Sequence, residues 1–201
     1  MTTPRDLFIV TVYDAATRPV EQGDLSLALA GAELVDLLDA GAVTLDDELI
    51  VPAPEGGTGD RLLDEAVAAL TRQAPYESVE DWLWRRGRGL SAAYLAVLEA
   101  DGTVARQRRR WLPLPTERTE LADSPERARS HERWTSGEPV LASLAAAVGI
   151  QDEAPEDLAG AASDATVTVV AAVTGAVTEL AAVRQRREIE DAAFDNVWRG
   201  L

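Results

Sequence analysis

The chain contains no cysteine, no lysine and one histidine among its 201 residues. Without cysteine, a disulfide framework and a thiolate metal site are both excluded, and nothing indicates an oxidising compartment. A single histidine cannot build a histidine-rich metal site, and the spacing of the acidic residues shows no all-carboxylate site. We therefore expect a cytosolic protein that folds without a metal or a cofactor.

The sequence also lacks an evident export signal. The apolar run from Leu7 to Tyr13 is too short for the hydrophobic region of a signal peptide. The nearly uncharged stretch 159–183 contains Asp164 and Glu179 and is rich in alanine, so its transfer into lipid would be poor. We predict a buried central helix there, followed by a charged, amphipathic tail over 184–201.

Motifs for catalysis are missing as well. His131 lies in a polar stretch and is accompanied by no serine or cysteine nucleophile motif, so a surface histidine is favoured over a catalytic base. The glycines before Asp60 resemble a phosphate loop, but the lysine of such a loop is missing. The acidic pair Asp46 and Asp47 fits a hairpin turn better than a metal cluster. We therefore expect a protein that is not an enzyme.

Charge is unevenly distributed along the chain. The net charge of -16 makes the molecule repel phosphate backbones and anionic lipid at long range. Between Trp84 and Arg118, however, eight arginines stand against three acidic residues, so this segment carries +5 and the remainder -21. Such a run is most often a solvated surface, and the alternative is an anion-binding site. Arginine without lysine, together with abundant alanine, suggests high-GC coding and a bacterial source.

Local patterns predict a single, mainly α domain over residues 1–201. Asp24, Asp60 and Ser78 are predicted to cap helices, and apolar residues at helical spacing follow them. Ser124, Pro125 and Glu126 are predicted to open a polar helix. A helix from Thr3 is also predicted, although the Ile-Val-Thr-Val run within it prefers strand. Further helices are predicted over 25–40, 90–100 and 138–148. We expect a helical bundle with peripheral amphipathic helices and one or two short β-hairpins.

The first predicted hairpin pairs Val43–Leu45 with Glu48–Val51, and the second pairs Thr103–Gln107 with Arg110–Leu114. Prolines at 113 and 115 make the return arm of the second hairpin an edge or an exposed projection. Arginine beside tryptophan suits a membrane interface or a protein contact. We therefore predict an interaction surface here, named the hairpin surface: Arg108, Arg109, Arg110, Trp111, Leu112 and Leu114.

Several segments together resemble the Golgi phosphoprotein 3 family. The most specific is TGDRLLDEA at 58–66, which is similar to the family's TGDxLLDEA signature where a loop meets a helix. Segments 27–34, 79–82 and 95–104 are similar to helical parts of the family, and the match runs in order from about 5 to 125. The resemblance implies a helical bundle with a projecting β-hairpin. It also implies peripheral membrane binding through phosphatidylinositol 4-phosphate and an adaptor role in sorting glycosyltransferases.

The resemblance also implies a headgroup pocket, which in eukaryotic members uses one tryptophan and three arginines. These positions fall on Glu21, Ala30, Arg88 and Ser91, so Arg88 alone matches. A phosphorylated inositol needs several donors together, and Glu21 would repel it. We therefore expect the pocket to be mostly not retained. The candidates for binding an anion or a headgroup are Arg88, Arg85 and Arg86.

Three function classes follow from these observations. The leading hypothesis is a peripheral adaptor whose hairpin surface meets an anionic membrane surface or a protein partner, at the inner face of a membrane. The resemblance adds a homo-oligomer formed through the hairpin. The alternative is a winged-helix-like, nucleic-acid-binding regulator, against which the acidic remainder of the chain argues. An enzyme that uses carboxylates alone is the third class.

Overall fold

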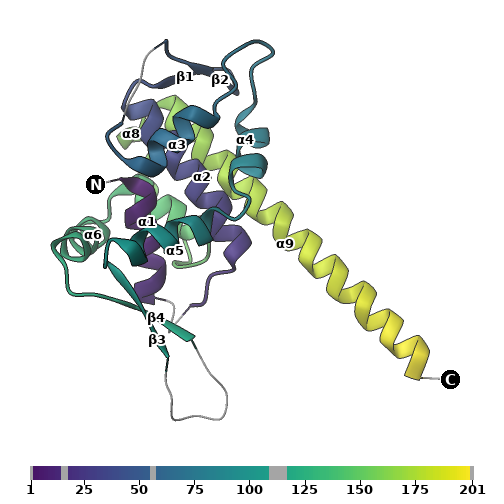
Figure 1. Cartoon of the computed structure of the whole chain (residues 1–201). Coiled ribbons are helices and arrows are strands. Elements are labelled where there is room, and N and C mark those ends of the chain that lie inside the picture. The colour runs from purple at the N-terminus through teal and green to yellow at the C-terminus, as the bar shows by residue number, and fades with distance from the viewer. Residues whose placement is uncertain (1, 15–17, 55–57, 109–116, 200–201) are drawn as a thin grey trace.

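The computed structural model describes residues 2–14, 18–54, 58–108 and 117–199, and it confirms a mainly α fold with short β-hairpins (Figure 1). Its helices are α1 (Thr3–Asp14), α2 (Gln22–Asp39), α3 (Arg61–Ala69), α4 (Val79–Arg86), α5 (Leu90–Ala100), α6 (Pro125–Thr135), α7 (Pro139–Ala147), α8 (Leu158–Ala161) and α9 (Asp164–Arg199). Its strands are β1 (Val43–Asp46), β2 (Leu49–Pro52), β3 (Val104–Arg108) and β4 (Glu117–Leu121).

Helix α2 is the centre of the core, with α1, α3, α4, α5, α7 and α9 packed around it. Thirteen of its residues are buried, which explains why its apolar side chains wrap most of the way around the helix. Its small residues let neighbours come close. A Cβ atom at Gly31 would collide with the side chain of Val173, so the lack of a side chain at this glycine lets α2 and α9 pack closely here.

Helix α9 contains the predicted central helix, but only one of its faces is buried. Val169, Val170, Val173 and Val177 pack on the core, whereas Ala171, Thr174 and Gly175 are exposed. By length and composition the helix over Asp164–Ala192 could also cross a membrane, because an 18-residue stretch of it has a mean hydropathy of 1.7. A core helix of a water-soluble protein has the same properties, and this face packs against α2, α4 and α7. Beyond the core, α9 continues away from the other helices as a single rod (Figure 1).

The predicted caps at Asp60 and Ser78 are confirmed, and so is the helix predicted to open at Ser124. Asp60 accepts hydrogen bonds from the backbone N–H groups of Leu62 and Leu63, and Ser78 and Ser124 accept similar bonds at the starts of α4 and α6. The prediction for Asp24 is wrong. Helix α2 already begins at Gln22, and the Asp24 carboxylate instead pairs with the Arg184 guanidinium on α9.

The first hairpin is confirmed as β1 paired with β2, and its turn contains Asp47 at a φ of 52°. In the second hairpin the outgoing arm is confirmed as β3, but the predicted return arm is wrong. Strand β4 covers Glu117–Leu121 and pairs Val104 with Leu121. Pro113 in the predicted arm and Pro115 directly after it each lack the N–H that a ladder needs, so the pairing forms beyond them, on a proline-free stretch.

Candidate functional site

The three candidate arginines at the end of α4 have different surroundings. The Arg85 guanidinium donates two hydrogen bonds of 2.6 Å to the Glu77 carboxylate and one of 3.0 Å to the Ala69 carbonyl. It also lies 5.3 Å from the ring of Trp82, close enough for a cation–π contact. Arg85 therefore links α4 to the end of α3 and to the segment that precedes α4.

Arg86 belongs to a buried network that ties α4 to α2 and α5. Its guanidinium donates hydrogen bonds of 2.7 and 2.9 Å to the two carboxylate oxygens of Glu33, and the Tyr94 hydroxyl donates a third of 3.1 Å. The Glu33 side chain has no solvent exposure. Burial raises the pKa of Glu33, and the Arg86 partner opposes that rise. This fully bonded network holds three helices together.

Arg88 differs from both, because it has no hydrogen bond or ion pair with any residue that the structure describes. It is exposed, and it follows the turn at Gly87 that ends α4. It lines a crevice of about 280 Å³ between α2, α5 and α9, in which it is the single charged residue among the described ones. The other lining residues include Trp84, Ser26, Ser91 and Leu180. The crevice thus pairs one available cation with an uncharged wall.

The remaining positions that match the family's headgroup pocket contribute little to this crevice. Glu21 is exposed and directly precedes α2, next to the lining residue Gln22. Ala30 is buried in the core, where its carbonyl accepts a hydrogen bond from the Trp82 indole N–H. The Ser91 hydroxyl accepts a hydrogen bond from Ser26, 2.9 Å away. The structure therefore brings Arg88 and Ser91 to one crevice and keeps Ala30 out of it.

The signature segment at 58–66 forms a different polar site. The carboxylate of Asp64 accepts hydrogen bonds from the Thr58 backbone N–H and hydroxyl, and these bonds lower the pKa of Asp64. Gly59, at a φ of 75°, allows the tight turn before the Asp60 cap. The signature thus encodes a turn that is fastened to the helix it starts.

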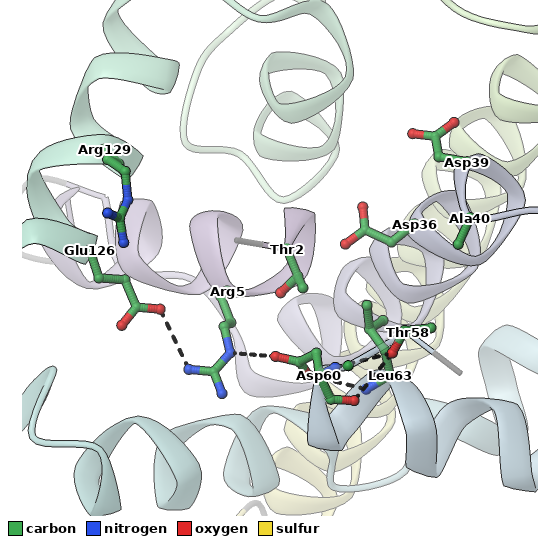
Figure 2. Close-up of a pocket in the computed structure, with 11 residues that line it drawn as sticks. Thr2, Arg5, Asp36, Asp39, Ala40, Thr58, Asp60, Leu63, Glu126 and Arg129 are labelled. Atoms are coloured by element: carbon green, nitrogen blue, oxygen red, sulfur yellow. Dashed lines mark hydrogen bonds and ion pairs between the residues drawn. The ribbon is translucent and has the colours of Figure 1, made fainter. Parts of the chain in front are cut away.

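This turn borders a cavity of about 540 Å³ at the junction of α1, α2, α3 and α6 (Figure 2). Arg5 on α1 reaches across it and donates hydrogen bonds to Asp60, Asp101 and Glu126, at 3.0, 3.0 and 3.5 Å. Sequence reasoning missed this cluster, because its members come from segments up to 121 residues apart. The signature was the one signal that pointed to this region.

Asp36 lines the same cavity from α2. Its carboxylate accepts a 2.8 Å hydrogen bond from the Thr3 backbone N–H at the start of α1. Burial raises the pKa of Asp36 to about 6, although the Thr3 hydrogen bond and the charge of Arg133 lower it. This carboxyl group therefore titrates near neutral pH, while a fixed arginine lies on the other side of the cavity.

The hairpin surface lies mostly outside the described residues. Of its members the structure describes only the backbone of Arg108, which pairs with Glu117 at the end of the β3–β4 ladder. Positions 109–116, with Arg109, Arg110, Trp111, Leu112 and Leu114, fall between the two strands and are not described. The predicted surface is thus located by sequence at the far end of this hairpin.

His131 is exposed on α6, and its ring lies 5.4 Å from the ring of Tyr13. The two rings flank a shallow apolar crevice that also includes Ile9 and Trp134. No carboxylate is among the described residues around it. The prediction that His131 is a surface residue is therefore confirmed.

Comparison with known protein families gives a match over nearly the whole chain. The family model described as Golgi phosphoprotein 3 (GPP34) matches residues 4–192. The match covers the signature turn, the α4 arginines, both hairpins and most of α9. A search of curated proteins finds no match to this chain.

Proposed function

Because the chain belongs to the Golgi phosphoprotein 3 (GPP34) family, we propose that it is a non-enzymatic adaptor that docks on an anionic membrane surface or on a protein held there. The proposed contact is the end of the β3–β4 hairpin, supported by Arg88. The proposed location is the cytosolic face of a membrane. The family match supports the type of module, and the proposal adds the surface and its chemistry.

The observation that carries this proposal is the position of the hairpin. Strands β3 and β4 extend away from the helical body (Figure 1). In the sequence, the segment between them contains consecutive arginines followed by tryptophan, Arg109, Arg110 and Trp111. Arginine side chains pair with phosphate, and tryptophan favours the boundary between water and hydrocarbon. A basic, aromatic tip on an acidic molecule would select one orientation against an anionic surface.

The test is co-sedimentation with vesicles of phosphatidylcholine alone and with added phosphatidylserine. The triple variant Arg109→Glu, Arg110→Glu, Trp111→Ala should lose binding to the anionic vesicles and keep its melting temperature. The matched control is Arg61→Glu, Arg72→Glu, which reverses two exposed arginines on other parts of the chain. If the hairpin is the contact, the control should bind like the parent.

Two results would refute this assignment. Equal loss of binding in the triple variant and in the control would mean that net charge alone drives the attraction. Unchanged binding in the triple variant would place the contact elsewhere on the molecule. A gel shift with duplex DNA, at two salt concentrations, tests the nucleic-acid alternative in parallel, because phosphate contacts make such binding fall steeply with salt.

For phosphatidylinositol 4-phosphate itself we propose weak or no selective binding. The crevice offers one arginine, Arg88, and Glu21 stands next to it. Vesicles that contain this lipid should therefore bind no better than phosphatidylserine vesicles of equal charge. Micromolar, headgroup-selective binding that disappears in Arg88→Ala would contradict this and restore the family's ligand.

A further inference from the structure

The last part of α9 stands free of the rest of the molecule. Among the described side chains of α9, the last one that bonds to another helix is Arg184, whose guanidinium donates hydrogen bonds of 2.8 and 2.7 Å to the Asp24 carboxylate. All eight residues from 185 to 192 are exposed, and eight residues make more than two helical turns. The whole circumference of the helix is therefore open to water there. We name residues 185–199 the α9 extension.

The end of a helix gains little stability in water when none of its faces is packed. The part of α9 on the core already nucleates the helix, but most helical stability in proteins comes from packing of one face. Residues 185–192 of the α9 extension have no packed face, because all of them are exposed. A partner that covers one face would supply the missing stabilisation.

Basic residues come before acidic residues in the extension, so two copies that run in opposite directions place opposite charges side by side. Arg186 and Arg187 are followed directly by Glu188, Glu190 and Asp191. Within the described side chains, neither Arg186 nor Glu190 has a salt bridge. Ile189, between the acidic residues, is 62% exposed and is the most exposed large hydrophobic side chain among those described. The exposed surface of the extension thus combines a positive charge, a negative charge and an apolar side chain within one helical turn.

We propose that the α9 extension pairs in antiparallel orientation with the α9 extension of a second copy of this chain. Arg186 and Glu190 are four residues apart, so they lie on the same side of the helix, next to Ile189. In an antiparallel pair each Arg186 can face the Glu190 of the second copy, and the two Ile189 side chains then meet near the twofold axis. A twofold interface of this kind uses the same patch on both copies.

The charges favour this occupant over others. In a parallel pair Arg186 would face Arg186, and Glu190 would face Glu190, so like charges would repel. Residues 185–192 hold two arginines against three acidic residues, so they lack the net positive charge that would attract anionic lipid or nucleic acid. The extension is only about 22 Å long, at about 1.5 Å per residue, so the contact is small and the pairing depends on concentration. This surface is separate from the hairpin surface.

Sedimentation velocity of the full chain over a range of concentrations tests the pairing through charge exchange. Arg186→Glu alone and Glu190→Arg alone each place like charges opposite each other, and each should weaken self-association by roughly tenfold, the factor that 1.4 kcal/mol produces. The double variant Arg186→Glu, Glu190→Arg restores opposite charges and should associate like the parent. An equimolar mixture of the two single variants should also associate. Ile189→Asp should abolish the pairing without a change in melting temperature.

Each other outcome overturns the proposal. A parent chain that stays monomeric at all concentrations would show that the extension is unpaired. Single variants that associate like the parent would place self-association elsewhere, and the hairpin triple variant would then test the hairpin. Weakened single variants without recovery in the double variant would exclude the antiparallel register. Because the chain has no cysteine, one cysteine in place of Gln185 and one in place of Ala192, in separate chains, should form a mixed disulfide only in the antiparallel pair.

Discussion

Glu33 and Asp36 are carboxylates three residues apart on helix α2, and the protein surrounds them differently. Glu33 is fully buried, and Arg86 and Tyr94 donate three hydrogen bonds to it. Asp36 lies at the edge of the cavity and accepts one backbone hydrogen bond, from Thr3. Burial raises the pKa of both carboxyl groups, but only Glu33 has an arginine bonded directly to it.

The difference shows that depth of burial does not by itself decide what a carboxylate does to stability. A buried charge costs several kcal/mol to desolvate, and a bidentate arginine with a further hydrogen bond offsets that cost. Glu33 is therefore part of a structural network, whereas Asp36 keeps an unfavourable charge at neutral pH. The comparison predicts opposite effects when the surroundings of each carboxyl group are changed.

The largest effect is expected for Arg86→Ala. This change leaves Glu33 buried without its cation, and breaking a buried pair from one side costs about 3 to 5 kcal/mol. The free energy of unfolding from urea titration should fall by that amount at neutral pH, and by less in acid, where Glu33 takes up a proton. Arg85→Ala is the matched control, because Arg85 is 45% exposed and should cost about 1 kcal/mol or less. Equal losses in both variants would mean that the Glu33 network has no special weight.

A moderate effect of opposite sign is expected for Asp36→Asn. The folded carboxyl binds its proton more tightly than the unfolded one, with a pKa of about 6 against 3.8, so its stabilising contribution is complete below about pH 4 and lost as the pH rises through 6. Asparagine stays neutral and can still accept the Thr3 hydrogen bond. The variant should be more stable by about 1 to 3 kcal/mol at pH 7. No gain is expected at pH 4, and a gain that does not change with pH would rule out titration of Asp36 as its cause.

The smallest effect is expected for Arg61→Ala. Arg61 pairs with Glu65 one turn later, but the two side chains are 78% and 49% exposed. Water and salt screen such a pair, so the free energy of unfolding should change by less than about 0.5 kcal/mol. Thermal melts at low and high salt should give nearly the same result. A loss that approaches that of Arg86→Ala would show that exposed and buried pairs contribute equally, contrary to the comparison.

Features that depend on neighbouring residues were predictable from the sequence. The caps at Asp60, Ser78 and Ser124 are short-range hydrogen bonds between a side chain and the backbone two or three residues on. The mainly α fold and the first hairpin followed from the same kind of local pattern. Helix α1 also formed as predicted, although it contains a run of β-branched residues, because burial against α2 outweighs their preference for strand.

Features that depend on distant partners were not predictable. Asp24 is of a residue type that often caps helices, but its carboxylate accepts hydrogen bonds from Arg184, which lies 160 residues away in the sequence. Glu33 and Asp36 looked alike on the sequence, because nothing local distinguishes a carboxylate that will meet Arg86 from one that will not. The cavity around Arg5 was missed for the same reason. Its charges come together only after α1, α3 and α6 have packed.

The close approach of Gly31 to Val173 also has a mechanical consequence. The contact acts as a pivot for α9, because the position on α2 that faces Val173 has no side chain that could yield. From Val173 to Arg199 the helix is about 39 Å long, at about 1.5 Å per residue. A tilt of about 5° at the crossing therefore moves the far end by roughly 3 Å. A methyl group added at position 31 would therefore shift the carboxyl-terminal end of α9 by more than it shifts the helix at Val173.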